Sequence, residues 1–237
     1  MGKYIARYAW GGGDGDLWGL VDVDQVYPLH TDFFSLKDLI VAGRGEVQAI
    51  AEHKPDSALA AEDVDFLSPL INPCRVICVG PNFKETDPET GEKINPNEDL
   101  HFYRKDESSL SSAKAPIVRP AGSKMLDYGV ELGLVIGKSI REATEITEEN
   151  LEDYVAGLIL VNDVLARDHI LQAPARQAYQ GTSYRSLTPT GPHMYLLDKG
   201  DLNDFLSNLE LKLWVNDTIR QSANTADWAI APHTILS

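Results

Sequence analysis

Apolar and polar residues alternate in the stretch from residue 126 to 138, which reads LDYGVELGLVIGK. Every second residue from Val130 to Ile136 is apolar, and Asp127, Gly129 and Glu131 occupy the other parity. Because the side chains of a strand alternate between its two faces, Asp127 and Glu131 are expected on the same face. Buried carboxylates need a cation or hydrogen bonds. The stretch therefore predicts either a metal or acid–base site or a solvated strand face.

Similar patterns predict further short strands and few helices. Strands are expected over residues 3–10, 17–29, 74–80, 101–105, 115–122, 159–168 and 206–221, the last as a hairpin that turns at Asn216 and Asp217. The run 74–80 is continuously apolar, which predicts a buried strand. Helices are expected over 35–43 and 46–54 and within 140–158, and long loops over 81–99 and 172–192.

The order of these elements predicts the fold class. Strands are many and short and do not alternate with helices as βαβ units, which indicates a β-rich α+β fold. The segment FLSPLINP, residues 66–73, carries two prolines and marks a boundary. We therefore expect a small N-terminal β/α domain over residues 1–70 and a larger domain over residues 71–237.

The charge of the chain narrows the range of partners. Its 237 residues include 36 acidic and 21 basic side chains, for a formal net charge of −15. Nucleic acids and anionic membranes favour basic surfaces, so a small-molecule substrate is expected instead. No stretch approaches the ~20 apolar residues of a membrane span. Cys74 and Cys78 are expected to be reduced and packed in a core strand, as suits a cytoplasmic protein.

Six segments occur in an order that resembles the fumarylacetoacetate hydrolase family, over roughly residues 66–228. They read FLSPLINPCRVICVGPNF, HFYRKDESSL, DYGVELGLVIGK, VAGLILVNDVLARD, GTSYRSLTPTGP and VNDTIRQSANTADW. The resemblance implies a mixed β-roll, barrel-like in shape, in a homodimer that binds Mg²⁺, Mn²⁺ or Ca²⁺. It also implies hydrolysis of C–C bonds, decarboxylation, hydration or tautomerisation of β-diketo or 2-oxo acids, whose paired oxygens such a cation can chelate.

The resemblance implies a metal site with one departure from the family. The family strand usually carries two glutamate ligands, and here only the second is present, as Glu131, because Gly129 stands at the first position. The third ligand is implied at Asp163, in the family's N-D-x-x-x-R-D motif. Asp127 is the candidate to fill the gap. A weakened metal site, or a site without a cofactor, is therefore expected.

The resemblance also implies catalytic and substrate-binding positions. The catalytic candidates are Glu85, Lys105, Arg167 and Asp168, and the substrate-binding candidates are Asn82, Phe83, Thr86, Thr182 and Tyr184. Hydrolytic family members carry a histidine base where Thr86 stands, so the adjacent Glu85 is the expected substitute base. The family's active-site lysine loop has Thr182 in place of its lysine.

Three functional interpretations stay open. The first is a divergent enzyme that acts on an enolisable oxo or diketo acid. The second is a metal-independent isomerase, dehydratase or cyclase, in which polar groups position the substrate. The third is a non-catalytic binding homologue, since a fold does not fix a function. Family members generally continue with strands that carry P-G-D and G-T-P motifs, so the C-terminal part of the family fold is expected to be missing from this chain.

Overall fold

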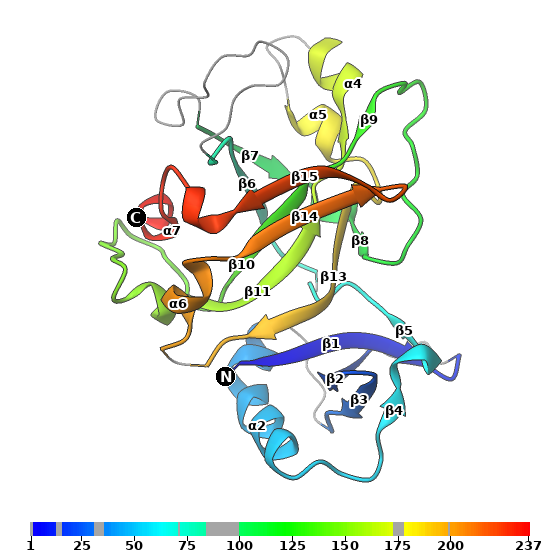
Figure 1. The fold of residues 1–237 in the computed structure, drawn as a ribbon, viewed down its shortest axis with the longest axis vertical. Helices are drawn as coiled ribbons and strands as arrows, with labels where there is room; N and C mark the ends of the chain where they lie inside the picture. Colours follow the sequence, from blue (N-terminus) through cyan, green and yellow to red (C-terminus); the bar gives the residue numbers. More distant parts are fainter. Residues whose placement is uncertain are drawn as a thin grey trace.

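Strand β1 (Lys3–Trp10) lies in the middle of a nine-stranded sheet that joins the two proposed domains (Figure 1). The computed structural model describes residues 2–12, 16–30, 36–70, 72–83, 100–172, 178–198 and 200–237. Within these residues the strand order is β10-β11-β13-β1-β2-β3-β4, with β5 paired to β1 and β8 to β13. The proposed division near residue 70 stays a prediction, because one continuous sheet crosses it.

The remaining strands of this sheet are β2 (Leu17–Asp22), β3 (Gln25–Pro28), β4 (Leu59–Ala60), β5 (Val64–Phe66), β8 (Leu110–Ser112), β10 (Val130–Ile136), β11 (Val155–Asn162) and β13 (Thr188–Leu196). Three two-stranded sheets pair β6 (Val76–Gly80) with β7 (His101–Lys105), β9 (Leu126–Asp127) with β12 (Leu165–Ala166), and β14 (Glu210–Val215) with β15 (Thr218–Asn224).

Helices are short in the described part of the chain. They are α1 (Leu36–Asp38), the π-helical turn η1 (Leu39–Gly43), α2 (Arg44–Glu52), α4 (Arg167–Gln172), α5 (Ala178–Thr182), α6 (Leu202–Leu206) and α7 (Pro232–Leu236). Single 3₁₀ turns are η2 (Ala61–Asp63), η3 (Glu107–Ser109), η4 (Leu151–Asp153) and η5 (Thr225–Asp227). Among these residues no helix is both long and apolar enough to cross a membrane.

The core fills both faces of the sheet where β1, β13 and β11 lie side by side. Ile5 of β1 pairs with Met194 of β13, which pairs with Ile159 of β11, and all three side chains are at most 4% exposed. Val47 and Ile50 of α2 pack on the same cluster. Burying each such side chain stabilises the fold by roughly 1.5–3 kcal/mol before the loss of conformational entropy.

The predicted fold class is confirmed: a large antiparallel sheet with few helices is the β-rich α+β architecture. The hairpin predicted at Asn216 and Asp217 is also confirmed, since both residues have positive φ (47° and 64°) between β14 and β15. Two central residues with positive φ match the right-handed twist of a hairpin.

The burial predicted for residues 74–80 is wrong. Within the described residues β6 pairs only with β7, and Ile77 on its outer face is 57% exposed. An apolar run is buried on both faces only when layers cover both. Cys74 and Cys78 are free, as expected, but each is only partly buried.

The predicted strand over 115–122 is absent, since β8 ends at Ser112 and the segment pairs with no neighbour. Pro116 and Pro120 remove backbone donors there. The helix predicted within 140–158 shortens to the turn η4, next to a local bond from Thr147 N to Asn150 Oδ1 of 2.9 Å. The two predicted helices over 35–43 and 46–54 form one helical run, because the π turn η1 joins α1 to α2.

The long loop predicted over residues 172–192 holds a core strand, so this prediction is wrong for its second half. Thr188 and Thr190 of β13 are at most 1% exposed. Their hydroxyls pair with those of Ser109 (2.7 Å) and Ser68 (2.6 Å). A strand whose buried positions are threonines paired with serines lacks the apolar signal on which sequence prediction depends.

Candidate functional site

Asp163 lies at the point where β11 leaves the sheet, directly across from Gly129. In the β10–β11 register Val130 pairs with Asn162. The next two residues, Gly129 and Asp163, are joined by a hydrogen bond in which the Asp163 N–H donates to the Gly129 carbonyl at 2.7 Å. Asp163 is only 7% exposed, although it carries a carboxylate. A buried carboxylate requires compensating partners, and strand β7 supplies them.

Tyr103 and Lys105 reach Asp163 from one face of β7, because residues two apart in a strand point the same way. The Lys105 ammonium donates to Asp163 Oδ1 at 2.5 Å, and the Tyr103 hydroxyl donates to Asp163 Oδ2. Lys105 also donates to the carbonyls of Val164 (3.2 Å) and Leu187 (2.8 Å), and its side chain is fully buried. All three ammonium protons are thereby used within the protein.

Cys78 and Glu131 complete the cluster. Cys78 lies across from Tyr103 in the β6–β7 register. Burial, and after it the charge of Asp163, raises the pKa of the Cys78 thiol to about 12 and raises the pKa of Tyr103 far above its usual range. The charge of Glu131 adds to both increases. Cys78 and Tyr103 are therefore neutral at physiological pH, and Tyr103 is a hydrogen-bond donor.

Gly129 leaves an open position beside these carboxylates. A Cβ atom placed on Gly129 would lie 3.3 Å from Glu131 Oε1 and 3.8 Å from the Asp163 Cβ atom. The Glu131 carboxylate thus lies alongside residue 129, on the side where Asp163 enters. Residues 129, 131 and 163 converge, but only two of them bear carboxylates, and a metal site at these positions stays a prediction.

The donor set does not fit a tightly held divalent cation. Within the described residues no group of three or more His, Cys, Asp or Glu side chains could hold a metal. Both oxygens of Asp163 already accept hydrogen bonds, one of them from an ammonium. Oxygen ligands of Mg²⁺ and Ca²⁺ must be free to face the ion, and here Asp163 directs both of its oxygens at Tyr103 and Lys105, which leaves Glu131, among the described residues, without a second carboxylate to share a cation.

Asp127 does not fill this gap in the structure. Its carboxylate forms an ion pair with the guanidinium of Arg167 and also accepts the Tyr128 N–H at 3.0 Å. Asp127 pairs with Leu165 across β9 and β12, one step further along the strand than Gly129 and Asp163. Asp127, a predicted metal ligand, and Arg167, a predicted catalytic residue, thus form a partly exposed ion pair with each other.

Asp168 holds a loop in place. The Lys124 N–H donates to it at 2.7 Å and the Ser123 hydroxyl at 2.9 Å. The pKa of Asp168 is lowered, chiefly by the Lys124 N–H. Its two oxygens therefore anchor the segment that leads into β9, beside Arg167.

Asn82 and Phe83 bind the segment after β15. The Asn82 carboxamide donates to the Ile230 carbonyl (2.9 Å) and accepts its N–H (3.0 Å), and Phe83 forms a bridge with Trp228. These contacts attach the start of the loop to the C-terminal part of the chain. Glu85 and Thr86 lie outside the described residues.

Thr182 and Tyr184 lie near α4 and α5. Thr182 is 1% exposed, and its hydroxyl donates to the Tyr179 carbonyl at 3.5 Å. The Tyr184 hydroxyl bonds to His169 Nδ1 at 2.9 Å. Ser183 connects this region to β7 by accepting the Asp106 N–H at 2.9 Å. Both residues therefore lie near the end of β7, without a bond to the Asp163 cluster.

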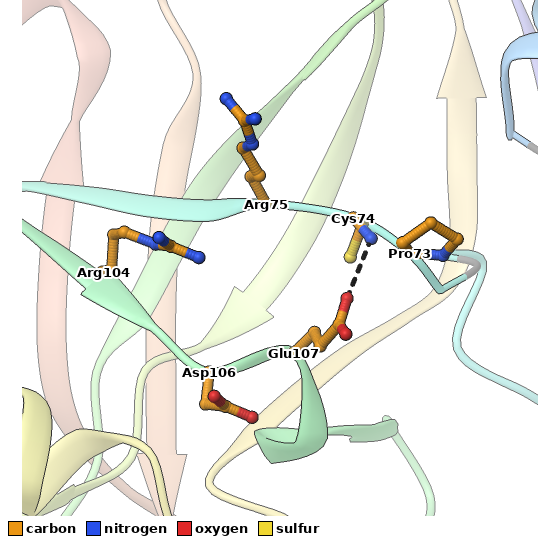
Figure 2. Close-up of a pocket in the computed structure, with 6 residues that line it drawn as sticks. All are labelled: Pro73, Cys74, Arg75, Arg104, Asp106 and Glu107. Carbon is orange, nitrogen blue, oxygen red and sulfur yellow. Dashed lines mark hydrogen bonds between the residues drawn. The ribbon is translucent and has the colours of Figure 1, made fainter.

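A separate hollow of about 490 Å³ lies at the end of the β6–β7 hairpin (Figure 2). It is lined by Pro73, Cys74, Arg75, Arg104, Asp106 and Glu107. Arg104 and Asp106 alternate with Lys105 along the chain, so they face away from the buried cluster. In Figure 2 the Arg75 side chain points away from Glu107, whose carboxylate accepts the Cys74 N–H at 3.2 Å.

Tyr103 and Cys78 are site residues that were not predicted from the sequence. The available signal was parity: in HFYRK, Tyr103 and Lys105 share a face, and a strand paired with 74–80 would bring Cys78 beside Tyr103. That pairing is not visible before the strands are aligned, because a one-residue slip would turn every side chain to the other face.

The comparisons agree on one family. The sequence model of the family described as fumarylacetoacetate (FAA) hydrolase C-terminal matches residues 75–237 of this chain. A Xenopus laevis protein named oxaloacetate tautomerase fahd2, mitochondrial, is 32% identical over 179 residues, which are 76% of this chain and 54% of that one. The chain thus spans about half the length of the curated relatives it matches.

Solved structures share the fold over almost all of the chain. The fumarylacetoacetate hydrolase of Exiguobacterium antarcticum is 29% identical with a TM-score of 0.77, covering 100% of this chain and 80% of that one. The maleylpyruvate hydrolase of Sphingobium sp. SYK-6, solved with manganese(II) and pyruvate, is 24% identical with a TM-score of 0.74, covering 98% and 81%. The second likeness concerns the fold alone.

Proposed function

Because this chain belongs to the fumarylacetoacetate hydrolase family, we propose that it is an enzyme that acts on a small enolisable β-diketo or 2-oxo acid. Among the reactions expected from the sequence, keto–enol tautomerisation suits the buried cluster best. The observation that carries this proposal is the neutral Tyr103 hydroxyl, held by Asp163 and Lys105 in the same cluster as the Glu131 carboxylate.

Tautomerisation requires one base and one hydrogen-bond donor. In the proposed step, Glu131 removes a proton from the carbon next to the substrate carbonyl. The Tyr103 hydroxyl moves its hydrogen bond from Asp163 Oδ2 to the carbonyl oxygen, where negative charge develops. Asp163 keeps its ion pair with the Lys105 ammonium during this step, so the negative charge of Asp163 stays compensated. The protonated Glu131 then returns this proton to the enolate oxygen to give the enol and regain its carboxylate, and the reverse sequence returns the keto acid.

Hydrolysis and decarboxylation each require a further catalytic group beyond Glu131 and Tyr103. Hydrolysis needs a base for water, for which Glu85 beside Thr86 stays the proposed candidate. Decarboxylation needs a strong electron sink, which a chelated cation supplies when bound.

Glu131 and Asp163 are the residues proposed for a weakened Mg²⁺, Mn²⁺ or Ca²⁺ site. No step is assigned to the cation, because the Lys105 ammonium already occupies Asp163 and the described residues contain no group of three metal-ligating side chains. Lys105 is proposed as a positioning residue for Asp163, since its protons are all engaged.

A metal-independent isomerase is the second candidate. The engagement of both Asp163 oxygens by protein donors favours it. A homodimer and a cytoplasmic location accompany both candidates as proposals.

The test is the rate at which an added 2-oxo acid enol, such as that of oxaloacetate, converts to its keto form. We expect the protein to accelerate the loss of enol absorbance above the buffer rate, with and without a chelator. A rate equal to buffer for a panel of oxo and diketo acids would contradict the proposal and favour a binding homologue.

A further inference from the structure

We infer that the Lys105 ammonium is the resident cation of this site, and that residue 129 decides whether a divalent ion can take its place. This inference rests on the same cluster as the proposed function. It concerns the charge of the cluster, and not the reaction.

The first step is the charge of the cluster. Asp163 and Glu131 are acidic, Lys105 is basic, and Tyr103 and Cys78 are neutral. Lys105 is fully buried, and its nitrogen lies 2.5 Å from Asp163 Oδ1. A divalent ion on Asp163 would lie beside this ammonium, and like charges repel strongly where water is excluded. The ammonium therefore disfavours the metal.

The second step is the hydrogen bonding that fixes Lys105. Two backbone carbonyls, of Val164 and Leu187, accept its remaining protons at 3.2 and 2.8 Å. Val164 directly follows Asp163, and its N–H bonds to the Leu187 carbonyl at 3.1 Å. The same backbone thus holds the cation and its counter-ion, so the ammonium cannot move aside without losing three hydrogen bonds.

The third step is the missing side chain. Gly129 faces Asp163 across the β10–β11 register, and its φ lies outside the left-handed region, so other residues are allowed. A Cβ there meets the Asp163 carbonyl and the end of Glu131 at 3.3 Å, so a larger residue requires these two groups to give way by a few tenths of an ångström. A glutamate at position 129 would add a third carboxylate and reverse the balance between ammonium and metal.

The experiment measures binding of Mn²⁺ alone to the full chain after chelator treatment, from the electron paramagnetic resonance signal of free Mn²⁺. We expect the wild type to bind with a Kd on the order of 1 mM or weaker. Gly129→Glu should lower the Kd by about tenfold or more, and the uncharged, equally large Gly129→Gln should not. Adding Asp163→Asn to Gly129→Glu should abolish the tighter binding, which locates it.

A second measurement probes the ammonium itself. In Lys105→Met the cluster becomes more anionic, so Mn²⁺ should raise the Tm of this variant more than that of the wild type. If Lys105→Met does not fold, the comparison of Mn²⁺ affinity between Gly129→Glu and Gly129→Gln still tests the inference. Micromolar Mn²⁺ binding by the wild type that Asp163→Asn removes would overturn the inference, as would equal affinities for the Glu and Gln variants.

Neither readout depends on turnover. An absent tautomerase activity together with the expected Mn²⁺ results would remove the proposed function and leave this inference intact. Turnover together with tight Mn²⁺ binding by the wild type would leave the proposed function intact and remove this inference.

Discussion

The side-chain amide of Gln221 in β15 pairs with both backbone groups of Val130 in β10. It accepts the Val130 N–H at 2.7 Å and donates to the Val130 carbonyl at 3.2 Å. One amide thus imitates a neighbouring strand at the edge of the sheet, where open backbone groups otherwise remain. Figure 1 shows the β14–β15 hairpin lying along β10. Since Val130 precedes Glu131, the contact also holds the backbone next to this carboxylate.

Replacing Gln221 with Ala should therefore affect stability and turnover together. Loss of two hydrogen bonds is expected to lower the free energy of unfolding by roughly 1–3 kcal/mol, measured by urea denaturation. The proposed turnover should fall as well, because the backbone next to Glu131 is no longer held. The exposed Ser222→Ala on the same hairpin is the control and should change neither. An unaltered unfolding curve for Gln221→Ala would show that the edge contact is dispensable.

The buried pair of Lys105 and Asp163 should show strong coupling. Lys105→Met alone leaves a buried carboxylate without its cation, which typically costs about 3–5 kcal/mol. The double variant Lys105→Met/Asp163→Leu should lose less than the sum of the two single variants, with a coupling of roughly 1–3 kcal/mol in a thermodynamic cycle.

The exposed pair of Lys212 and Glu210, with a nitrogen–oxygen distance of 2.9 Å, is the matched control. Its coupling should not exceed about 1 kcal/mol, because solvent screens it. Equal coupling in the two pairs would mean that burial adds nothing to the Lys105–Asp163 interaction.

The part of this site that could be predicted from the sequence is the part carried by alternation within one strand. Parity placed Gly129 and Glu131 on one face, and the family resemblance added Asp163. Lys105 was identified from its motif, but not its engagement by two carbonyls, because backbone groups of distant segments leave no signal in side-chain patterns. Likewise, β13 was missed because its buried Thr188 and Thr190 find hydroxyl partners that only the folded chain brings near.

The two thiols should differ in reactivity. The pKa of Cys78 rises from 9.0 to about 12, first through burial and then through Asp163, whereas that of Cys74 is raised through burial and Glu107. A raised thiol pKa leaves less thiolate, so in a thiol-labelling time course near neutral pH Cys74 should react first. Cys74→Ser should remove the faster phase, and denaturant should equalise the sites. A faster phase that survives Cys74→Ser would contradict the assignment.

The same shift gives a pH dependence of stability. Because the folded thiol keeps its proton to higher pH than the unfolded one, the stability that Cys78 contributes is present below pH 9.0 and is lost as the pH rises toward about 12. Cys78→Ala should flatten that alkaline decline in unfolding measurements, whereas Cys74→Ser should flatten it less.

The decisive variant for the proposed reaction is Glu131→Gln, which keeps the size of the side chain and removes the base. If Glu131 takes the substrate proton, the rate of enol–keto conversion should fall by about 10²–10⁴-fold. The fold should persist, because glutamine fills the same space as glutamate, and the far-ultraviolet circular dichroism and Tm should stay close to the wild type. Glu210→Gln on the exposed face of β14 is the matched control and should retain full activity. Tyr103→Phe should also lower the rate, because it removes the hydrogen-bond donor to the carbonyl oxygen while the Glu131 base remains. If Glu131→Gln kept the wild-type rate while Tyr103→Phe lost it, the proton would have to leave through another group, and Glu131 would not be the base.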